Sequence, residues 1–182
     1  QLMLGKKSGM MIGSMASYTN NKNAVMQNSR LQDYRLKGMD HAIFADFRTF
    51  LTERAYLNLS LRYQTDKLEY ENSNKKELDF TKNFDGLYPT MNLAYTFDKK
   101  KGRMLSLGYR YYQSFPNFGY FFDVKEVYSD NSYSIGNPNL DPEHFHLAEL
   151  TYTHNKALNF VYSYRRGTDL VQVMTFTEEE NP

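Results

Sequence analysis

The 182-residue sequence contains no cysteine and no tryptophan. Without cysteine there is neither a disulfide framework nor a thiolate metal site. The chain also has no run of about 18 apolar residues, which excludes a transmembrane helix. Its formal net charge is only +1, so its composition gives no reason to expect nucleic acid or an acidic partner. No signal peptide opens the sequence, and we therefore expect a mature chain or a piece of one.

Aromatic residues are abundant. The chain holds 16 Tyr and 13 Phe, yet its mean hydropathy is −0.70. A strand of a membrane barrel shows lipid only every second side chain, so it combines apolar rows with a polar average. The composition is therefore compatible with a β-barrel in a membrane.

The stretch 87–112 shows this pattern most clearly. It consists of two runs of about ten residues on either side of a polar turn, 98–102. In each run the odd positions are mostly apolar and the even positions mostly polar. Successive side chains of a strand point to opposite faces, so each run predicts a strand with one apolar face. Ten residues tilted by about 45° rise roughly 25 Å, the height of a barrel's apolar band.

The same alternation predicts an all-β, antiparallel, up-and-down transmembrane β-barrel segment of about seven strands. The expected strands are 9–19, 41–50, 55–70, 87–97, 103–112, 143–153 and 157–173. The polar segments 20–40, 71–85 and 113–142 are expected to be long loops. Long and short connections then alternate, which places all long loops at one end, as in outer-membrane barrels.

Alternation alone does not say which row faces inward, because a soluble barrel places the apolar row inside. Tyrosines near the strand ends of the apolar row favour lipid outside, since they suit an interfacial girdle. The opposite row carries more charge than a half-exposed soluble sheet requires. We predict that this row lines a wet lumen with Asp46, Arg48, Arg62, Asn92, Arg110, Glu149 and Arg165.

One ordered set of motifs resembles a known family. Its most specific piece is the run Gly136, Asn137, Pro138, Asn139, Leu140, Asp141, Pro142 and Glu143, just before a predicted strand. Leu61-Arg62-Tyr63, residues 87–95, Tyr109-Arg110-Tyr111 and Tyr128-Ser129-Asp130 accompany it in order. The set covers roughly residues 40–176 and resembles the Bacteroidetes outer-membrane β-barrel family related to TonB-dependent receptors. In physical terms the Gly-Asn-Pro run is turn chemistry, because glycine permits positive φ and proline fixes φ.

The resemblance implies transport across the outer membrane of a Gram-negative bacterium. Members of the family look like barrels with about three times as many strands, which follow a plug domain. We therefore expect residues 1–182 to be part of a larger barrel, without the plug. The implied partners are outer-membrane lipid, an energy-coupling periplasmic protein that meets other regions, and in some relatives a surface lipoprotein.

The longest predicted loop holds the best candidates for ligand binding, a cluster of aromatic rings: Phe118, Tyr120, Phe121, Phe122 and Tyr128. These rings could stack on a sugar or a siderophore, or they could pack the loop onto the barrel rim. His144 and His146 could share a metal, but no third ligand stands at a suitable spacing.

We expect a non-enzymatic transport barrel without a cofactor. No Gly-x-Ser-x-Gly elbow supports a hydrolase. Two alternatives stay open at this point, a soluble ligand-binding β-barrel and an outer-membrane barrel enzyme.

Overall fold

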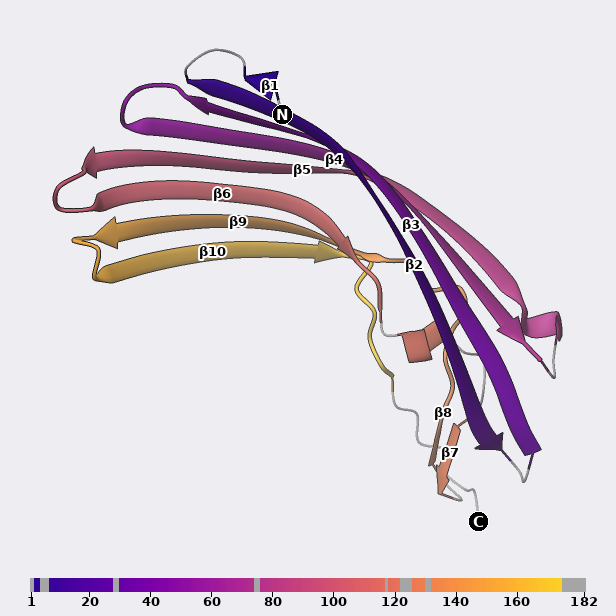
Figure 1. The fold of residues 1–182 in the computed structure, drawn as a ribbon. Helices are drawn as coiled ribbons and strands as arrows, with labels where there is room; N and C mark the ends of the chain where they lie inside the picture. Colours follow the sequence, from indigo (N-terminus) through magenta and orange to yellow (C-terminus); the bar gives the residue numbers. More distant parts are fainter. Residues whose placement is uncertain are drawn as a thin grey trace.

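A computed structural model of the chain describes residues 2–3, 7–27, 30–73, 76–116, 118–121, 126–129 and 132–174. Its main feature is one antiparallel sheet that arches strongly (Figure 1). In spatial order the sheet contains β1 (Leu2–Met3), β2 (Ser8–Gln27), β3 (Arg30–Phe50), β4 (Ala55–Asn72), β5 (Phe80–Asp98), β6 (Arg103–Ser114), β9 (Glu143–His154) and β10 (Leu158–Thr168). The connection between β6 and β9 contains a small separate hairpin, β7 (Glu126–Ser129) and β8 (Ser132–Ser134), and the 3-10 turn η2 (Phe118–Phe121). A second 3-10 turn, η1 (Lys76–Leu78), lies between β4 and β5.

The prediction of seven antiparallel up-and-down strands is confirmed by this topology, with the two-residue β1 as an addition. Of the residues described, none forms a helix long and apolar enough to cross a membrane. Alternation is also confirmed by the register. Leu57 lies opposite Leu93, which lies opposite Leu107, and Leu107 lies opposite Leu150.

Several predicted boundaries are wrong. Segment 20–40 was expected to be a loop, but β2 continues to Gln27 and β3 already begins at Arg30. In the same way β4 runs to Asn72 and β5 starts at Phe80, which leaves little of the expected loop 71–85. The last strand was expected to reach residue 173, but β10 ends at Thr168, just before Asp169 with its positive φ of 59°.

The 3-10 turn η2 lies beneath the arch, on the concave side of the sheet (Figure 1). Phe121 of η2 packs against Tyr34, Leu36, Leu68 and Tyr70, so these side chains face inward. Because strand side chains alternate, the even-numbered residues of β4 face inward along its whole length. The odd-numbered residues of β4 form the outer, convex face.

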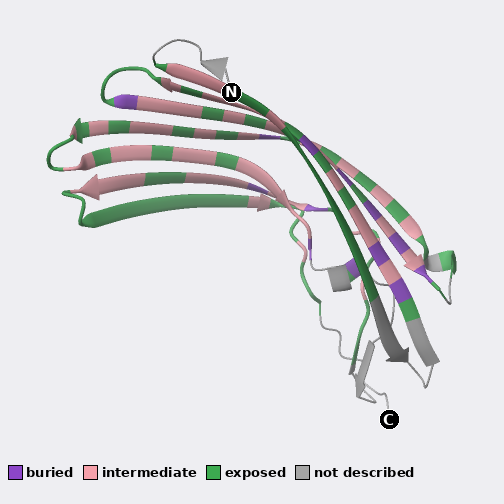
Figure 2. Cartoon of the chain, viewed as in Figure 1, coloured by how far each residue is buried: buried purple, intermediate pink, exposed green. Residues whose placement is uncertain are grey.

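Each face changes its chemistry along β4. The outer face first shows Leu57, Leu59, Leu61 and Tyr63, and then, from residue 65 onward, polar and charged side chains. The inner face does the reverse, with Asn58, Ser60, Arg62 and Gln64 followed, after Asp66, by Leu68 and Tyr70. The buried residues accordingly gather in the part of the hairpins that projects beyond the apolar outer rows (Figure 2). Below this change, toward the start of β4, the outer face is therefore apolar. Above it, toward the end of β4, the inner face is apolar.

Above the change, the outer face is covered by a ladder of opposite charges. Arg35 Nη1 lies 3.8 Å from Glu71 Oε2, and Lys37 Nζ lies 3.9 Å from Glu69 Oε2. Lys37 Nζ also donates to Glu71, which raises the pKa of Lys37, and Lys67 lowers the pKa of Glu69 by donating to its carboxylate. Such pairs are typical of a surface in water, where each contributes little to stability.

The upper edge of the apolar outer rows runs obliquely across the sheet. On β2 it reaches Tyr18, whose register row crosses β4 at Lys67. On β10 it reaches Tyr164, whose row crosses β4 at Leu59. The edge thus moves by eight residues over six strand-to-strand steps. A strand rises by about 3.3 Å per residue, and neighbouring strands lie about 4.8 Å apart. If the apolar edge is level with the membrane surface, the strands must therefore be tilted by about 40°, a value typical of membrane barrels.

The β9–β10 turn lies one residue later than the predicted strands 143–153 and 157–173 place it. Three residues form the loop, and Asn155 has a left-handed conformation with φ 51°, as does Lys156 with φ 60°. The loop was placed at 154–156, but it occupies 155–157, because the amide of Ala157 donates to the carbonyl of His154. Tyr152 therefore pairs with Phe160 rather than Leu158. The shift is two residues, so every side chain keeps its predicted face.

Exchanging a leucine of the outer rows for arginine should destabilise the fold strongly. Leu59 lies mid-row and is 41% exposed, so Leu59→Arg should cost about 2–4 kcal/mol in a bilayer. Asn92, an exposed inner-face residue on β5, provides the matched control, and Asn92→Arg should cost far less. The measurement is a urea titration of the complete protein folded into lipid vesicles. Equal losses for the two variants would contradict the assignment of faces.

Candidate functional site on the inner face

The seven residues predicted to line a lumen lie on one face of the sheet. They fall into three successive register rows: Asp46, Arg110 and Arg165 in one row, Arg48, Asn92 and Glu149 in the next, and Arg62 in the row on the other side. We call these seven residues the inner belt. It lies on the concave face, level with the apolar outer rows.

Two arginines of the inner belt rest on aromatic rings. Arg165 Cζ lies 3.9 Å from the centre of the Phe145 ring, and Arg110 Cζ lies 5.0 Å from that of Tyr112. The two rings are themselves 5.4 Å apart. A guanidinium stacked on a ring keeps its N–H edge free for other acceptors. Among the described residues, no arginine of the inner belt forms an ion pair with a carboxylate, so these cations remain available to a solute.

A polar network closes the upper end of the inner belt. Its centre is Asp66, which is only 4% exposed and lies directly opposite Asp40 on β3. Gln64 Nε2 donates to Asp66 Oδ1 at 2.6 Å, and Gln113 Nε2 donates to Asp66 Oδ2. The Tyr88 hydroxyl in turn donates to Gln113. We call these five residues the mouth network.

The mouth network joins β3, β4, β5 and β6 through side chains alone. It extends at one end to Ser17 of β2, which donates to Asp40 Oδ2 at 2.6 Å, and at the other to Arg62, which donates to Gln64 Oε1 at 2.8 Å. Asp66 stands beyond the row Tyr63–Leu87, where the apolar outer face of β4 and β5 ends. Burial raises the pKa of the Asp66 carboxyl, and the neighbouring Asp40 raises it further.

Sequence reasoning did not single out Asp66. The signal was available, since Asp66 is the one acid on a face that continues as Leu68 and Tyr70. Gln113 could not be found as a partner in this way, because it belongs to a segment for which the sequence predicts a loop.

The segment after β6 folds back over the inner face and is anchored there. Phe121 is fully buried in the cluster with Leu68 and Tyr70, and Leu140 packs against the same cluster. Lys82 Nζ donates to the carbonyl of Leu140 at 2.6 Å. The amide of Asn137 donates to the carbonyl of Tyr120 at 2.6 Å, which ties both ends of the segment together.

The turn predicted within residues 136–143 is confirmed at Asn137–Leu140, whereas Gly136 does not use a positive φ. The amide of Leu140 donates to the carbonyl of Asn137 at 3.3 Å, and the amide of Asn139 donates to Asn137 Oδ1 at 2.9 Å. These two bonds close a turn at Pro138 and Asn139. After this turn the chain continues through Pro142, which is buried, to the start of β9.

The five aromatic residues proposed for ligand binding have different surroundings. Tyr120 is 43% exposed, whereas the buried ring of Phe121 is a packing anchor in this conformation. Phe118 and Tyr128 lie in η2 and β7, where the structure describes their backbone, and Phe122 lies outside the described residues. Ligand binding by this cluster therefore stays a prediction.

His144 and His146 lie on β9 beside Tyr111 rather than in the belt, and the Tyr111 ring is 5.8 Å from that of Tyr88 in the mouth network. His144 Nδ1 is 3.5 Å from Asp169 Oδ2, and His146 Nδ1 is 2.9 Å from the hydroxyl oxygen of Tyr109. The described part of the chain brings no three His, Asp or Glu side chains together in a way that could hold a metal ion.

Comparison with known proteins gives one family. The model of the outer membrane protein beta-barrel family matches residues 7–182. No curated protein matches the chain.

Neutralising Asp66 should change how stability depends on pH. Its raised pKa means that the protonated carboxyl favours the folded state. This contribution is complete below the ordinary aspartate pKa of about 3.9 and is lost as pH rises through the raised value. Asp66→Asn should therefore unfold at higher urea than wild type at pH 7, with the difference shrinking toward pH 4.

Asp98→Asn is the control variant, because the pKa of Asp98 is shifted in the opposite direction. Amides of the β5–β6 turn donate to its carboxylate and lower its pKa, so its contribution is present at neutral pH and lost on acidification. Asp98→Asn should thus weaken the protein at pH 7 and not at low pH. Parallel pH profiles for the two variants would refute the assignment for Asp66.

Removing the buried ring of the η2 anchor should release the segment from the inner face. Burying a phenylalanine side chain is worth about 3–5 kcal/mol relative to alanine, so Phe121→Ala should open the segment to limited proteolysis. Tyr120→Ala, next to it but exposed, should leave the cleavage rate near wild type. Identical protection in both variants would show that Phe121 is not the anchor.

Proposed function

Because the chain belongs to the outer membrane protein beta-barrel family, we propose that it forms part of the wall of an outer-membrane transport barrel of the TonB-dependent-receptor type. The observation that carries the proposal is the inner belt together with the mouth network. Four arginines, two acids and an amide occupy three successive rows of the concave face, and a buried polar network continues them upward. Polar side chains lining the inside of such a wall suit the passage of a hydrated solute.

In this proposal the segment above the belt meets the solute first. Tyr120 is exposed on it, and Lys82 and Phe121 hold it over the mouth. A solute would then pass along the inner belt, whose arginines suit carboxylate, phosphate or hydroxyl groups. A plug supplied by another part of the protein closes the passage, and an energy-coupling periplasmic protein opens it. A surface lipoprotein is a further partner in a Gram-negative host.

The chain contributes binding and passage and no chemical step, so we propose that it is not an enzyme and needs no cofactor. The apolar outer rows support a bilayer over the soluble-barrel alternative. Phe160 on β10 is 62% exposed and Leu59 is 41% exposed, on an outer face that extends from β2 to β10. Soluble proteins seldom expose apolar surface of that extent.

The test is growth of cells on solutes too large for a general porin. Wild-type cells, cells lacking the complete protein, and cells lacking the energy-coupling protein are grown on single oligosaccharides, peptides or chelated iron. We expect both mutants to fail on the same source and to grow normally on its small constituents. A strain that lacks the protein and grows like wild type on every source would overturn the proposal, as would a defect that the energy-coupling mutant does not share.

A further inference from the structure

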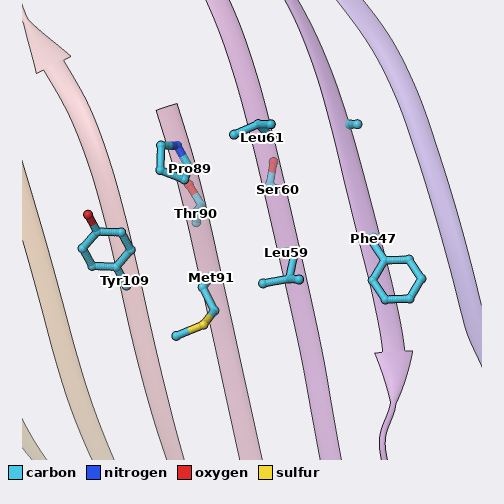
Figure 3. A pocket seen from close by; sticks show the side chains of 9 residues that line it. Phe47, Leu59, Ser60, Leu61, Pro89, Thr90, Met91 and Tyr109 are labelled. Carbon is cyan, nitrogen blue, oxygen red and sulfur yellow. The ribbon is translucent and has the colours of Figure 1, made fainter. Parts of the chain in front are cut away.

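Two arginines of the inner belt share one register row across β6, β9 and β10. They are Arg110 on β6 and Arg165 on β10. Tyr109, the residue before Arg110, lines a shallow apolar hollow on the outer face together with Leu59 and Met91 (Figure 3). Successive side chains of a strand point to opposite faces, and paired residues share a face. Both arginines therefore belong to the inner face.

Two aromatic rings draw these arginines toward each other. The rings belong to Tyr112 on β6 and Phe145 on β9, which pair directly, and their centres are 5.4 Å apart. The Cζ atom of Arg165 lies 3.9 Å from the centre of the Phe145 ring, so this side chain reaches across from β10 to β9. Arg110 Cζ lies 5.0 Å from the centre of the Tyr112 ring on its own strand. The backbones of the two arginines are two strand steps apart, about 10 Å, whereas their guanidinium groups lie over adjacent rings.

The Phe145 ring is a fixed platform. Only 6% of Phe145 is exposed, and the residue paired with it on β10 is Gly167. A Cβ atom at Gly167 would lie 2.9 Å from Phe145 Cε1, well inside the usual contact distance of about 3.5–4.0 Å between carbon atoms. The glycine therefore leaves the space that the ring occupies, and the ring in turn supports the guanidinium of Arg165.

The nearest acids on this face are bound to other groups. Glu143 Oε1 accepts from the amide of Val171 at 2.9 Å, and Glu149 Oε2 accepts from the hydroxyl of Ser163 at 3.3 Å. Within the part of the chain that the structure describes, neither carboxylate forms an ion pair with either arginine. Two like charges that lie close together repel each other, and an anion that contacts both relieves the repulsion. The fold thus holds two cations side by side and leaves their neutralisation to a ligand.

The chemistry of the two side chains selects the ligand. A guanidinium presents paired N–H donors that match the oxygens of a carboxylate or a phosphate. We propose that Arg110 and Arg165, supported by the rings of Tyr112 and Phe145, bind a solute that carries two or more carboxylate or phosphate groups. This inference rests on the proposed function, which places the inner face along the passage, and it narrows the transported solute to a polyanion.

The test is calorimetric titration of the complete protein in neutral detergent. The probes are trigalacturonate, which carries carboxylates, tripolyphosphate, and maltotriose as a neutral sugar of the same length. We expect at least one of the anions to bind, and maltotriose to bind at least about tenfold more weakly. Arg110→Gln and Arg165→Gln should each raise the dissociation constant of that anion about tenfold, the scale of one charge-assisted hydrogen bond. The two anionic probes distinguish a carboxylate ligand from a phosphate ligand.

Arg48→Gln is the matched control, since it removes the same charge from the β3 part of the inner belt, away from the two rings. Its affinity for the anions should stay near that of wild type. Equal weakening by Arg48→Gln and Arg165→Gln would overturn the site, because only the general positive potential of the belt would then matter. Equal affinity for maltotriose, or no binding of either anion, would overturn it as well.

The growth test separates this inference from the proposed function. If the anions bind as expected and the growth test fails, transport is contradicted and the two-arginine site stands. If the growth test succeeds and neither anion binds, transport stands and the site is overturned.

Discussion

The two-residue period of the β-strand is the constraint on which the structure depends. Every side chain of a paired strand must face one of two media, and a change of medium along the strand requires a change of pattern on both faces at once. On β4 this happens between Tyr63 and Leu68. Below, the outer row is apolar and the inner row polar, and above, the two exchange. A bilayer that ends at this height accounts for both halves of the same strand.

The bilayer also accounts for the slant of the apolar edge. A sheet whose strands stood upright would end its apolar rows along one register row. Here the edge descends steadily from Tyr18 on β2 to Tyr164 on β10, as expected of strands tilted in a barrel wall. The strand tilt, the height of the membrane and the register are therefore determined together. They also set the height of the inner belt.

The membrane-spanning parts of the strands and the inner belt could be predicted from sequence because alternation is strongest where one face meets lipid. Most of the projecting parts of the hairpins, apart from residues 65–70 of β4, could not, since their outer face is charged and their apolar residues, such as Leu36, are sparse. Segments 20–40 and 71–85 consequently looked like loops. The β9–β10 turn lies one residue later than the predicted strand bounds 153 and 157 indicate, because a pairing shifted by two residues leaves every side chain on the same face. The mouth network depends on pairing across four strands, which no local pattern reveals.

The core above the membrane explains how a polar network can persist at the mouth. Asp66 is buried beside Asp40, an arrangement that is unfavourable when both are charged. It is held because the strands continue upward as a packed hairpin, where Phe121 packs in one cluster with Leu36 and Tyr70. That packing holds the backbone just beyond Asp66, and Gln64 and Gln113 donate to its oxygens. Apolar burial outside the bilayer thus supports polar burial at its edge, and the segment that carries Phe121 is coupled to both.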